Sequence, residues 1–298
     1  MATVKEITGP MRPPFLILTP ACVLLGFSVA IWAGEPVQFW QFLLVLVGAV
    51  AAHISVNAFN EYFDFKSGLD ARTRRTPFSG GSGTLPEHPE VARSALVTAV
   101  ISLTIVALVG LYFTLIRGAS LLPLGILGMI TIVIYTTTFL RSPFLSLIAP
   151  GLGFGTLMVM GTYFALTGRY TWSAFVASLV PFFLVSDLLF LNQFPDVEAD
   201  QSIGRRHYPI TLGRHTASYI YTAFLALAYL SIVIGVALGL LPWPALLGLL
   251  TIILAIRAAR TAITHSDDIP NLLPALGMNV LINILTPALT AVGLLLAG

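Results

Sequence analysis

The sequence contains little charge. Only 9% of its 298 residues are Asp, Glu, Lys or Arg, 57% are hydrophobic, and the mean hydropathy is +0.91. A soluble domain carries roughly 25% charged residues, and its surface-to-volume ratio leaves no way to bury this much apolar area. The composition excludes an ordinary soluble domain and predicts an integral membrane protein.

Cysteine is also scarce, and the net charge is small. The single cysteine, Cys22, excludes an intramolecular disulfide and a cysteine-based metal cluster. The formal net charge of +2 gives no sign of nucleic-acid binding, and no feature indicates a protein partner. We therefore expect membrane lipid as the surroundings and small molecules as the partners.

Long apolar runs define the fold. A membrane-spanning helix needs about 20 mostly apolar residues. Nine stretches meet this requirement, at about 14–33, 38–60, 94–116, 119–139, 144–167, 173–193, 215–239, 242–263 and 270–297. We expect an all-α, polytopic membrane protein, in which about nine transmembrane helices form one bundle and residues 1–298 form a single membrane-embedded domain.

Basic residues are unevenly divided between the predicted loops. The N-terminal tail and the even-numbered loops hold all the Lys and Arg residues except Arg117 and Arg169, which lie in the opposite loops. Positive charge accumulates on the cytoplasmic side of a plasma or inner membrane. This asymmetry predicts a cytoplasmic N-terminus and an outer C-terminus.

Two of the cytoplasmic loops are long and polar, at about 61–93 and 194–214. We call them the first and second cap segments. They follow the second and sixth predicted spans, and most of the acidic residues lie in them or at their edges. The sequence therefore concentrates its chemistry at two points on one side of the membrane.

Just before each cap segment lies an Asn that is followed four residues later by an Asp. If the second span continues as a helix, Asn60 and Asp64 share a face with His53 and Asn57. In the second segment Asn192, Asp196 and Asp200 step by four and are expected to share a face, with Pro195 bending the helix.

Crowded carboxylates at a membrane surface require compensation. Their burial costs several kcal/mol unless they are paired or bind a metal. Mg²⁺ prefers oxygen ligands and is typically held by one or two carboxylates together with substrate phosphates. One such segment is compatible with an acidic, solvated helix end, but two with the same spacing on the same side favour a Mg²⁺–diphosphate site.

Basic residues follow both acidic segments. Arg72, Arg74 and Arg75 follow the first, and Arg205 and Arg206 follow the second. Arginine forms bidentate hydrogen bonds with phosphate, but positive residues also belong on this side for topological reasons, so both explanations remain open. The stretch 79–83 (SGGSG) could cradle an anion, although it lacks the Lys of a P-loop.

Asp187 lies within the sixth predicted span. An ionisable residue at that depth is a functional hypothesis by default, and we assign it a catalytic role beside the acceptor, with a buried hydrogen-bonding role as the equal alternative. For His53, Asn279 and Asn283, hydrogen bonding within the bundle is the favoured explanation.

The two segments resemble the paired aspartate motifs of the UbiA superfamily of intramembrane prenyltransferases. Residues 60–70 read NEYFDFKSGLD and residues 192–200 read NQFPDVEAD. Both are similar to the MenA-type branch, which prenylates 1,4-dihydroxy-2-naphthoate. Glu61 departs from the pattern, since many members have Asp there, and is not expected to bind metal directly. The resemblance covers nearly the whole chain.

The resemblance implies a Mg²⁺-dependent prenyltransferase. Loss of diphosphate from an isoprenyl diphosphate gives an allylic cation, which an electron-rich aromatic carbon attacks. Asp64 and Asp196 are then central to catalysis. The implied ligands of Mg²⁺–diphosphate are Asn60, Asp64, Asp70, Asn192, Asp196 and Asp200, and the implied phosphate contacts are Arg72, Arg75 and, from the segment 135–141 (YTTTFLR), Arg141.

The expected function is prenyl transfer to an aromatic quinone precursor, with 1,4-dihydroxy-2-naphthoate favoured. Other acceptors remain open: 4-hydroxybenzoate, homogentisate, a chlorophyllide or a glycerol-phosphate lipid. From another class, a cation-coupled transporter would carry its acidic residues near the midplane, whereas here all but Asp187 cluster at one face.

Overall fold

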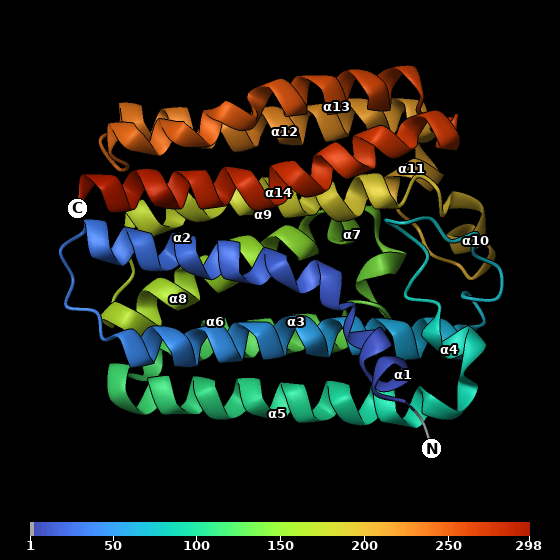
Figure 1. Ribbon diagram of the computed structural model, residues 1–298, viewed down its shortest axis with the longest axis horizontal. Coiled ribbons are helices and arrows are strands. Elements are labelled where there is room, and N and C mark those ends of the chain that lie inside the picture. Colours follow the sequence, from blue (N-terminus) through green and yellow to red (C-terminus); the bar gives the residue numbers. More distant parts are fainter. Residues whose placement is uncertain (1–2) are drawn as a thin grey trace.

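Helices make up every regular element among residues 3–298, the part of the chain that the computed structural model describes (Figure 1). The α-helices are α1 (Val4–Thr8), α2 (Leu18–Trp32), α3 (Phe39–Ser67), α4 (Thr84–Glu87), α5 (Ala92–Arg117), α6 (Leu122–Ile134), α7 (Pro143–Gly151), α8 (Met158–Thr167), α9 (Trp172–Asn192), α10 (Val197–Ser202), α11 (Tyr208–Thr211), α12 (Arg214–Ala237), α13 (Ile252–Thr264) and α14 (Ile269–Ala297). The 3₁₀-helices are η1 (Gly9–Met11), η2 (Pro13–Ile17), η3 (Pro89–Val91), η4 (Ala119–Leu121), η5 (Phe139–Arg141) and η7 (Trp243–Thr251), and η6 (Leu152–Leu157) is a π-helix.

Eight helical stretches in the described residues are long and apolar enough to cross a membrane. They are Pro13–Trp32, Phe39–Ser67, Pro89–Arg117, Pro143–Thr167, Trp172–Asn192, Arg214–Ala237, Trp243–Thr264 and Ile269–Ala297. A ninth apolar stretch, Ala119–Ile134, is shorter. This confirms the predicted all-helical membrane fold of about nine spans, eight of full length and one short.

The short stretch differs from the expected span 119–139. Helix α6 ends at Ile134, and turns occupy 135–138. Three consecutive threonines follow Tyr135, and β-branched side chains disfavour a helix. The unwound segment places the Thr136 hydroxyl where it accepts a hydrogen bond from Asn60 Nδ2 at 3.2 Å.

The long helices lie roughly side by side, and the short elements gather at one end (Figure 1). Helix α3 packs against α5, α9 against α12, and α2 against α14 and α8. Helices α1, α4, α10 and α11 lie at the end that also carries both cap segments, and the C-terminus lies at the opposite end (Figure 1). The topology therefore brings the two cap segments together.

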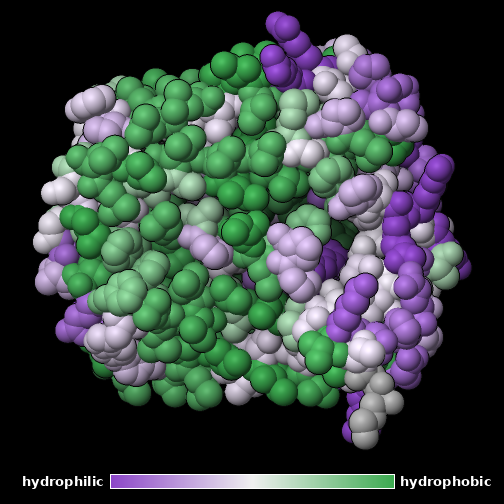
Figure 2. All heavy atoms as spheres, viewed as in Figure 1, coloured by the Kyte–Doolittle hydropathy of each residue, from purple (hydrophilic) through white to green (hydrophobic). Residues whose placement is uncertain are grey.

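The outer surface between the two ends is apolar. Figure 2 shows hydrophobic residues over most of the visible face and polar residues concentrated at the cap end. Large side chains of α5 and α6 are exposed, for example Leu108 (61%), Leu115 (76%) and Ile126 (48%). Such a surface is stable in lipid and not in water.

The two motif helices end differently. Helix α3 continues to Ser67, seven residues past the predicted end of the span, and stops where Gly68 adopts a left-handed conformation (φ 73°). Helix α9 stops at Asn192, so the expected common helical face of Asn192, Asp196 and Asp200 is wrong. A proline at 195 disfavours the helical conformation of the residue before it and has no N–H to donate.

Gly151, the last residue of α7, and Gly155 of the π-helix η6 lie directly against α9. A Cβ atom on Gly151 would lie 1.9 Å from the Phe182 carbonyl oxygen, and one on Gly155 would lie 2.3 Å from the Phe182 nitrogen. Gly153, between them, has no neighbour within 4 Å of its own Cβ position. Because backbone lies against backbone at Gly151 and Gly155, only glycine allows the observed contact.

This contact gives a stability test. We expect Gly155→Ala to lower the free energy of unfolding by roughly 1–3 kcal/mol, because the added methyl group overpacks a rigid backbone contact. Gly153→Ala is the matched control and should leave stability nearly unchanged. Thermal unfolding of both variants in detergent checks this, and equal unfolding midpoints would contradict the assigned contact.

Candidate active site

A cavity of about 890 Å³ opens beneath the cap segments. On α3 it is lined from Asp64, at the cap end, to Val45, a separation of roughly 28 Å at 1.5 Å per helical residue. Its cap end is polar, and its far end is lined by apolar residues such as Phe113 and Leu121. Figure 2 shows a hollow where the apolar surface meets the polar cap.

The cavity also reaches the lipid-facing surface. Leu111, Leu122 and Ile126 line it, yet they are 52%, 43% and 48% exposed. The cavity wall is therefore continuous with the outer surface of α5 and α6, and an apolar molecule could extend from the cavity into the bilayer.

The first motif meets the cavity along one face of α3, as its spacing predicts. His53, Asn57, Asn60 and Asp64 all line it. Glu61 points elsewhere: it is 1% exposed, and Arg12 Nε lies 2.6 Å from its Oε1. Its carboxylate also accepts hydrogen bonds from the backbone N–H and the hydroxyl of Ser82. Glu61 therefore anchors a loop and an arginine. This agrees with the expectation that Glu61 does not bind metal directly.

Arg12 is a site residue that sequence reasoning missed. Its Nη2 donates to Asn60 Oδ1 at 2.9 Å, and it lines the cavity. Its φ of 52° is the one positive value for a non-glycine residue in the described chain, a conformation that tends to occur at functional sites. The available signal was an arginine directly before two prolines, since proline disfavours the helical conformation of the residue before it.

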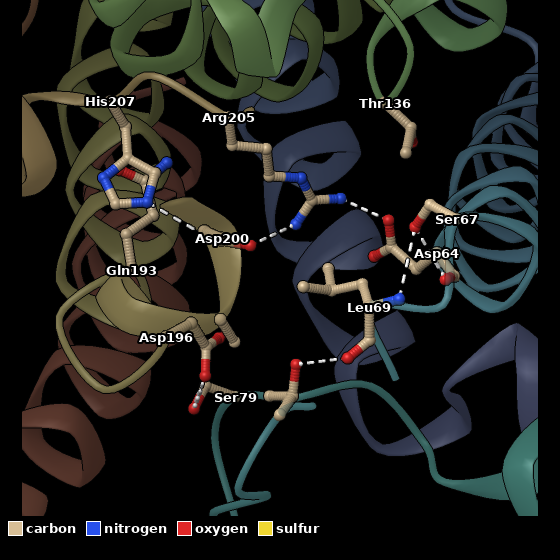
Figure 3. Close-up of polar contacts among 12 residues, drawn as sticks. Asp64, Ser67, Leu69, Ser79, Thr136, Gln193, Asp196, Asp200, Arg205 and His207 are labelled. Atoms are coloured by element: carbon tan, nitrogen blue, oxygen red, sulfur yellow. Dashed lines mark hydrogen bonds and ion pairs between the residues drawn. The ribbon is translucent and has the colours of Figure 1, made fainter. Parts of the chain in front are cut away.

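The second motif reaches the cavity from a turn and a short helix. Asn192 ends α9, Asp196 lies in the turn and Asp200 lies in α10, and all three line the cavity. Ser79 of the glycine-containing loop donates to Asp196 Oδ1 at 3.2 Å. The first cap segment thus contacts the second motif directly (Figure 3).

Arg205 connects the two motifs. Its Nη2 donates to Asp64 and its Nη1 to Asp200, the latter at 2.8 Å, as Figure 3 shows. Asp200 Oδ2 also lies 3.0 Å from His207 Nε2. Burial alone would lower the pKa of Arg205, but the two carboxylates raise it overall. Burial alone would raise the pKa of Asp200, but the His207 hydrogen bond and the Arg205 charge lower it overall.

Asp70 and Asp196 have no ion-pair partner among residues 3–298. Burial, together with neighbouring carboxylates, raises the pKa of each to about 7. Asp70 Oδ2 and Asn192 Oδ1 are also buried without a hydrogen-bond partner in the described structure. These oxygens lack a cation or a donor, so the residues present fit Mg²⁺, which prefers oxygen ligands.

The motif carboxylates do not form a closed cage. In the part of the chain that is described, the only group of three or more His, Cys, Asp or Glu residues whose ligand atoms all lie within 4.8 Å of one another is Glu6, His88 and Glu90, near the surface. Separated carboxylates leave coordination positions open for phosphate oxygens, as in sites where Mg²⁺ binds together with a substrate.

The structure places the three arginines predicted as phosphate contacts outside the cavity lining. Arg72 donates to the Ser202 hydroxyl at 3.2 Å and joins the two cap segments. Arg75 pairs with Glu87 at 2.8 Å, and Arg141 is exposed in η5. The arginines that face the cavity are Arg12 and Arg205.

Asp187 is likewise not brought to the cavity. Its side chain is fully buried in α9, and neither carboxyl oxygen has a hydrogen-bond partner in the described residues. Its backbone oxygen accepts a hydrogen bond from Asn279 Nδ2 at 3.1 Å. The predicted position beside the acceptor does not agree with this geometry, because Asp187 does not line the cavity that Asn192, on the same helix, does line.

Known proteins share both the sequence and the fold. The chain is 29% identical over 236 residues (78% of this chain, 74% of the relative) to 1,4-dihydroxy-2-naphthoate octaprenyltransferase of Bacillus subtilis. It is 29% identical over 303 residues (100% and 99%) to the protein of the same name from Mycobacterium leprae.

Two solved structures share its fold. A UbiA homolog from Aeropyrum pernix in its apo form superposes with a TM-score of 0.71 at 18% identity, covering 93% of this chain and 97% of that one. A UbiA homolog from Archaeoglobus fulgidus bound to DMAPP and Mg²⁺ superposes with a TM-score of 0.62 at 15% identity, covering 97% and 99%.

The sequence pattern of the UbiA prenyltransferase family matches residues 19–272. That range includes the long helices that carry both motifs, together with most of the residues that line the cavity beneath the cap segments. The chain is therefore a prenyltransferase and belongs to the UbiA prenyltransferase family.

Proposed function

We propose that this prenyltransferase transfers a prenyl group from an isoprenyl diphosphate to 1,4-dihydroxy-2-naphthoate, within the membrane and with Mg²⁺. The observation that carries the proposal is the cavity itself, which has paired Asn and Asp residues at its polar end and a long apolar arm that reaches lipid. A diphosphate with an isoprenoid tail has the same division into a polar end and an apolar chain.

The polar end supplies the donor site of this proposal. Its Mg²⁺–diphosphate ligands, direct or through water, are Asn60, Asp64, Asp70, Asn192, Asp196 and Asp200. Bound there, Mg²⁺ would offset the charge of the diphosphate and make it a better leaving group. Arg12 and Arg205 replace Arg72, Arg75 and Arg141 as the proposed phosphate contacts, because they line the cavity.

The reaction breaks the bond between the first prenyl carbon and the diphosphate oxygen, and the bonding electrons leave with the diphosphate. An electron-rich ring carbon of the acceptor then forms the new carbon–carbon bond, and that carbon regains its aromatic state by losing its proton, or CO₂ where it is the carbon that carries the carboxylate. The apolar arm holds the isoprenoid tail out of water. Gly110, Gly125 and Gly128 line this arm, and no atom lies closer than 3.9 Å to a Cβ built on them, which leaves width for a branched chain.

The acceptor is supported by the relatives rather than by the donor site. The Bacillus subtilis and Mycobacterium leprae relatives are named for prenylation of 1,4-dihydroxy-2-naphthoate, and the second match extends over the full chain. The Archaeoglobus fulgidus homolog with DMAPP and Mg²⁺ supports the donor and the metal through its shared fold. A transporter is disfavoured, because the cavity-lining acids lie at one end and not at mid-depth.

The proposal places the caps and the N-terminus in the cytoplasm, with residues 1–298 working as one domain. The distribution of basic residues supports this orientation. At the opposite end the two arginines have local partners: Arg117 donates to the Ala165 and Leu166 carbonyls, and Arg169 pairs with Glu35.

A reconstituted reaction tests the function. Purified protein in nanodiscs, supplied with geranylgeranyl diphosphate, Mg²⁺ and a panel of acceptors, should prenylate 1,4-dihydroxy-2-naphthoate and lose this activity in EDTA. Mass spectrometry of the products identifies the acceptor. Product from another acceptor alone would correct the proposed substrate, and no product with any donor length would reject the proposal.

The motifs are tested by conservative substitution. Asp64→Asn and Asp196→Asn should each reduce kcat/KM by about 100-fold or more, since metal sites are that sensitive even to changes around their ligands. Asp187→Asn is the matched control: it removes a buried carboxyl outside the cavity and should change kcat/KM by less than about threefold. Steady-state kinetics of the three variants test whether the aspartates that line the cavity are functional and the buried Asp187 is structural.

The Mg²⁺ requirement should depend on pH. Because the pKa of Asp70 and that of Asp196 are raised to about 7, both carboxyls are largely protonated below pH 7 in the metal-free protein. Protons then compete with the metal. For each proton that Mg²⁺ must displace, the half-saturating Mg²⁺ concentration rises by up to about tenfold per unit by which the pH falls below 7. Titration of activity with Mg²⁺ at pH 6, 7 and 8 checks this, and a constant half-saturating concentration would contradict it.

A further inference from the structure

Below the two motifs the cavity wall is mostly apolar, and most of its polar groups are already satisfied. The hydroxyls of Thr114, Thr131 and Thr162 each donate to a carbonyl of their own helix. Two lining residues deeper than Asn57 differ, His53 on α3 and Asn283 on α14, because the described residues supply no hydrogen bond to His53 Nε2 or to Asn283 Oδ1. A buried polar atom without a partner costs free energy, and Asn283 Oδ1 is such an atom, so a ligand that donates a hydrogen bond to it is expected.

A chain of hydrogen bonds fixes the amide of Asn283. The backbone carbonyl of Asp187 can only accept a hydrogen bond, so the Asn279 atom that lies 3.1 Å from this carbonyl oxygen is the donor, Nδ2. Asn279 Oδ1 is then the atom that faces Asn283, whose Nδ2 also donates to the Asn279 carbonyl at 3.0 Å. The remaining atom is Asn283 Oδ1, which is buried and has no partner among the described residues. It can only accept a hydrogen bond.

His53 is oriented in a similar way. Its Nδ1 lies 2.8 Å from the Thr19 hydroxyl, and its ring meets Phe154 edge to face, with 4.6 Å between centroids and 77° between planes. The contact with Thr19 leaves Nε2 as the nitrogen that a ligand in the cavity can reach. Phe154 belongs to the π-helix η6, which lies against α9 at Gly155.

The two side chains lie at similar depths. On α3, His53 is seven residues below Asn60, roughly 10 Å. On the other side the depth is counted along two helices. Asp187 is five residues below Asn192 on α9, and Asn279 of α14 contacts Asp187. Asn283 is four residues below Asn279 on α14, so it lies roughly 13 Å below Asn192. Both are therefore about two helical turns below the Asn residues of the proposed diphosphate site.

We infer that His53, Phe154 and Asn283 form the binding site for a hydroxylated aromatic acceptor, in which Asn283 Oδ1 accepts a hydrogen bond from a ring hydroxyl. His53 Nε2 bonds a second ring oxygen, and the edge of Phe154 packs against the ring. The reacting prenyl carbon is attached to the diphosphate, so the acceptor ring has to lie in the roughly 10–13 Å between the motifs and these side chains. This inference rests on the proposed prenyl transfer and adds the residues that select the acceptor.

Asn283→Leu tests the site, since leucine has nearly the same shape and lacks the acceptor oxygen. We expect the KM for 1,4-dihydroxy-2-naphthoate to rise about tenfold, the effect of one lost hydrogen bond, while the KM for geranylgeranyl diphosphate stays within about threefold. Thr162→Val is the matched control, because it removes a cavity-lining hydroxyl that is bonded only to its own helix. It should change neither constant.

A second measurement uses the ligand instead of the protein. 1-Hydroxy-2-naphthoate and 4-hydroxy-2-naphthoate each lack one ring hydroxyl, and their inhibition constants against 1,4-dihydroxy-2-naphthoate are compared in wild-type and Asn283→Leu protein. The analogue that lacks the hydroxyl bound by Asn283 should bind both proteins equally, and the other should bind the variant about tenfold more weakly.

The outcomes separate the two proposals. A wild-type protein that prenylates no acceptor would reject the proposed function. A wild-type protein that is active, with unchanged acceptor KM in Asn283→Leu and in His53→Phe, would reject the acceptor site alone. Parallel loss of donor and acceptor affinity in Asn283→Leu would mark Asn283 as a structural residue and also reject the site.

Discussion

The site depends on one buried guanidinium. Arg205 contacts Asp64 of the first motif and Asp200 of the second, and these residues come from distant parts of the sequence. Without a shared cation, two carboxylates brought together at low dielectric would repel each other. Arg205 therefore makes the convergence of the two cap segments favourable, and it leaves Asp70 and Asp196 as the cavity-lining carboxylates that have no ion-pair partner in the described residues.

A second set of contacts holds the cap loops in place around this centre. Glu61 binds Arg12 and Ser82, and Ser79 binds Asp196. Arg72 joins the two cap segments through Ser202. Together these contacts connect the N-terminal segment, the first cap segment and the second cap segment, so the polar end is positioned before any ligand arrives. Such pre-organisation lowers the cost of binding a highly charged substrate.

The sequence predicted the membrane fold, the two cap segments and the meeting of the motif residues, which all line one cavity, because composition, span length and Asn-to-Asp spacing are local properties. It failed where distant contacts decide. Arg72, Arg75 and Arg141 are close to the motifs in sequence but lie outside the cavity lining, whereas Arg12 lines it from the start of the chain. The helical continuation through Asp196 failed at Pro195, and Asp187 has helical spacing consistent with the site but does not line the cavity.

The opening of the cavity between α5 and α6 also bears on the length of the product. Leu111 and Ile126 belong to the cavity wall and are also exposed at the outer surface, so a bound isoprenoid can extend past them into lipid. A site of this shape does not select donors by their number of isoprene units. The chain length attached to the quinone is then decided by the isoprenyl diphosphates that the cell's synthases supply, and two organisms with the same transferase could make quinones with tails of different length.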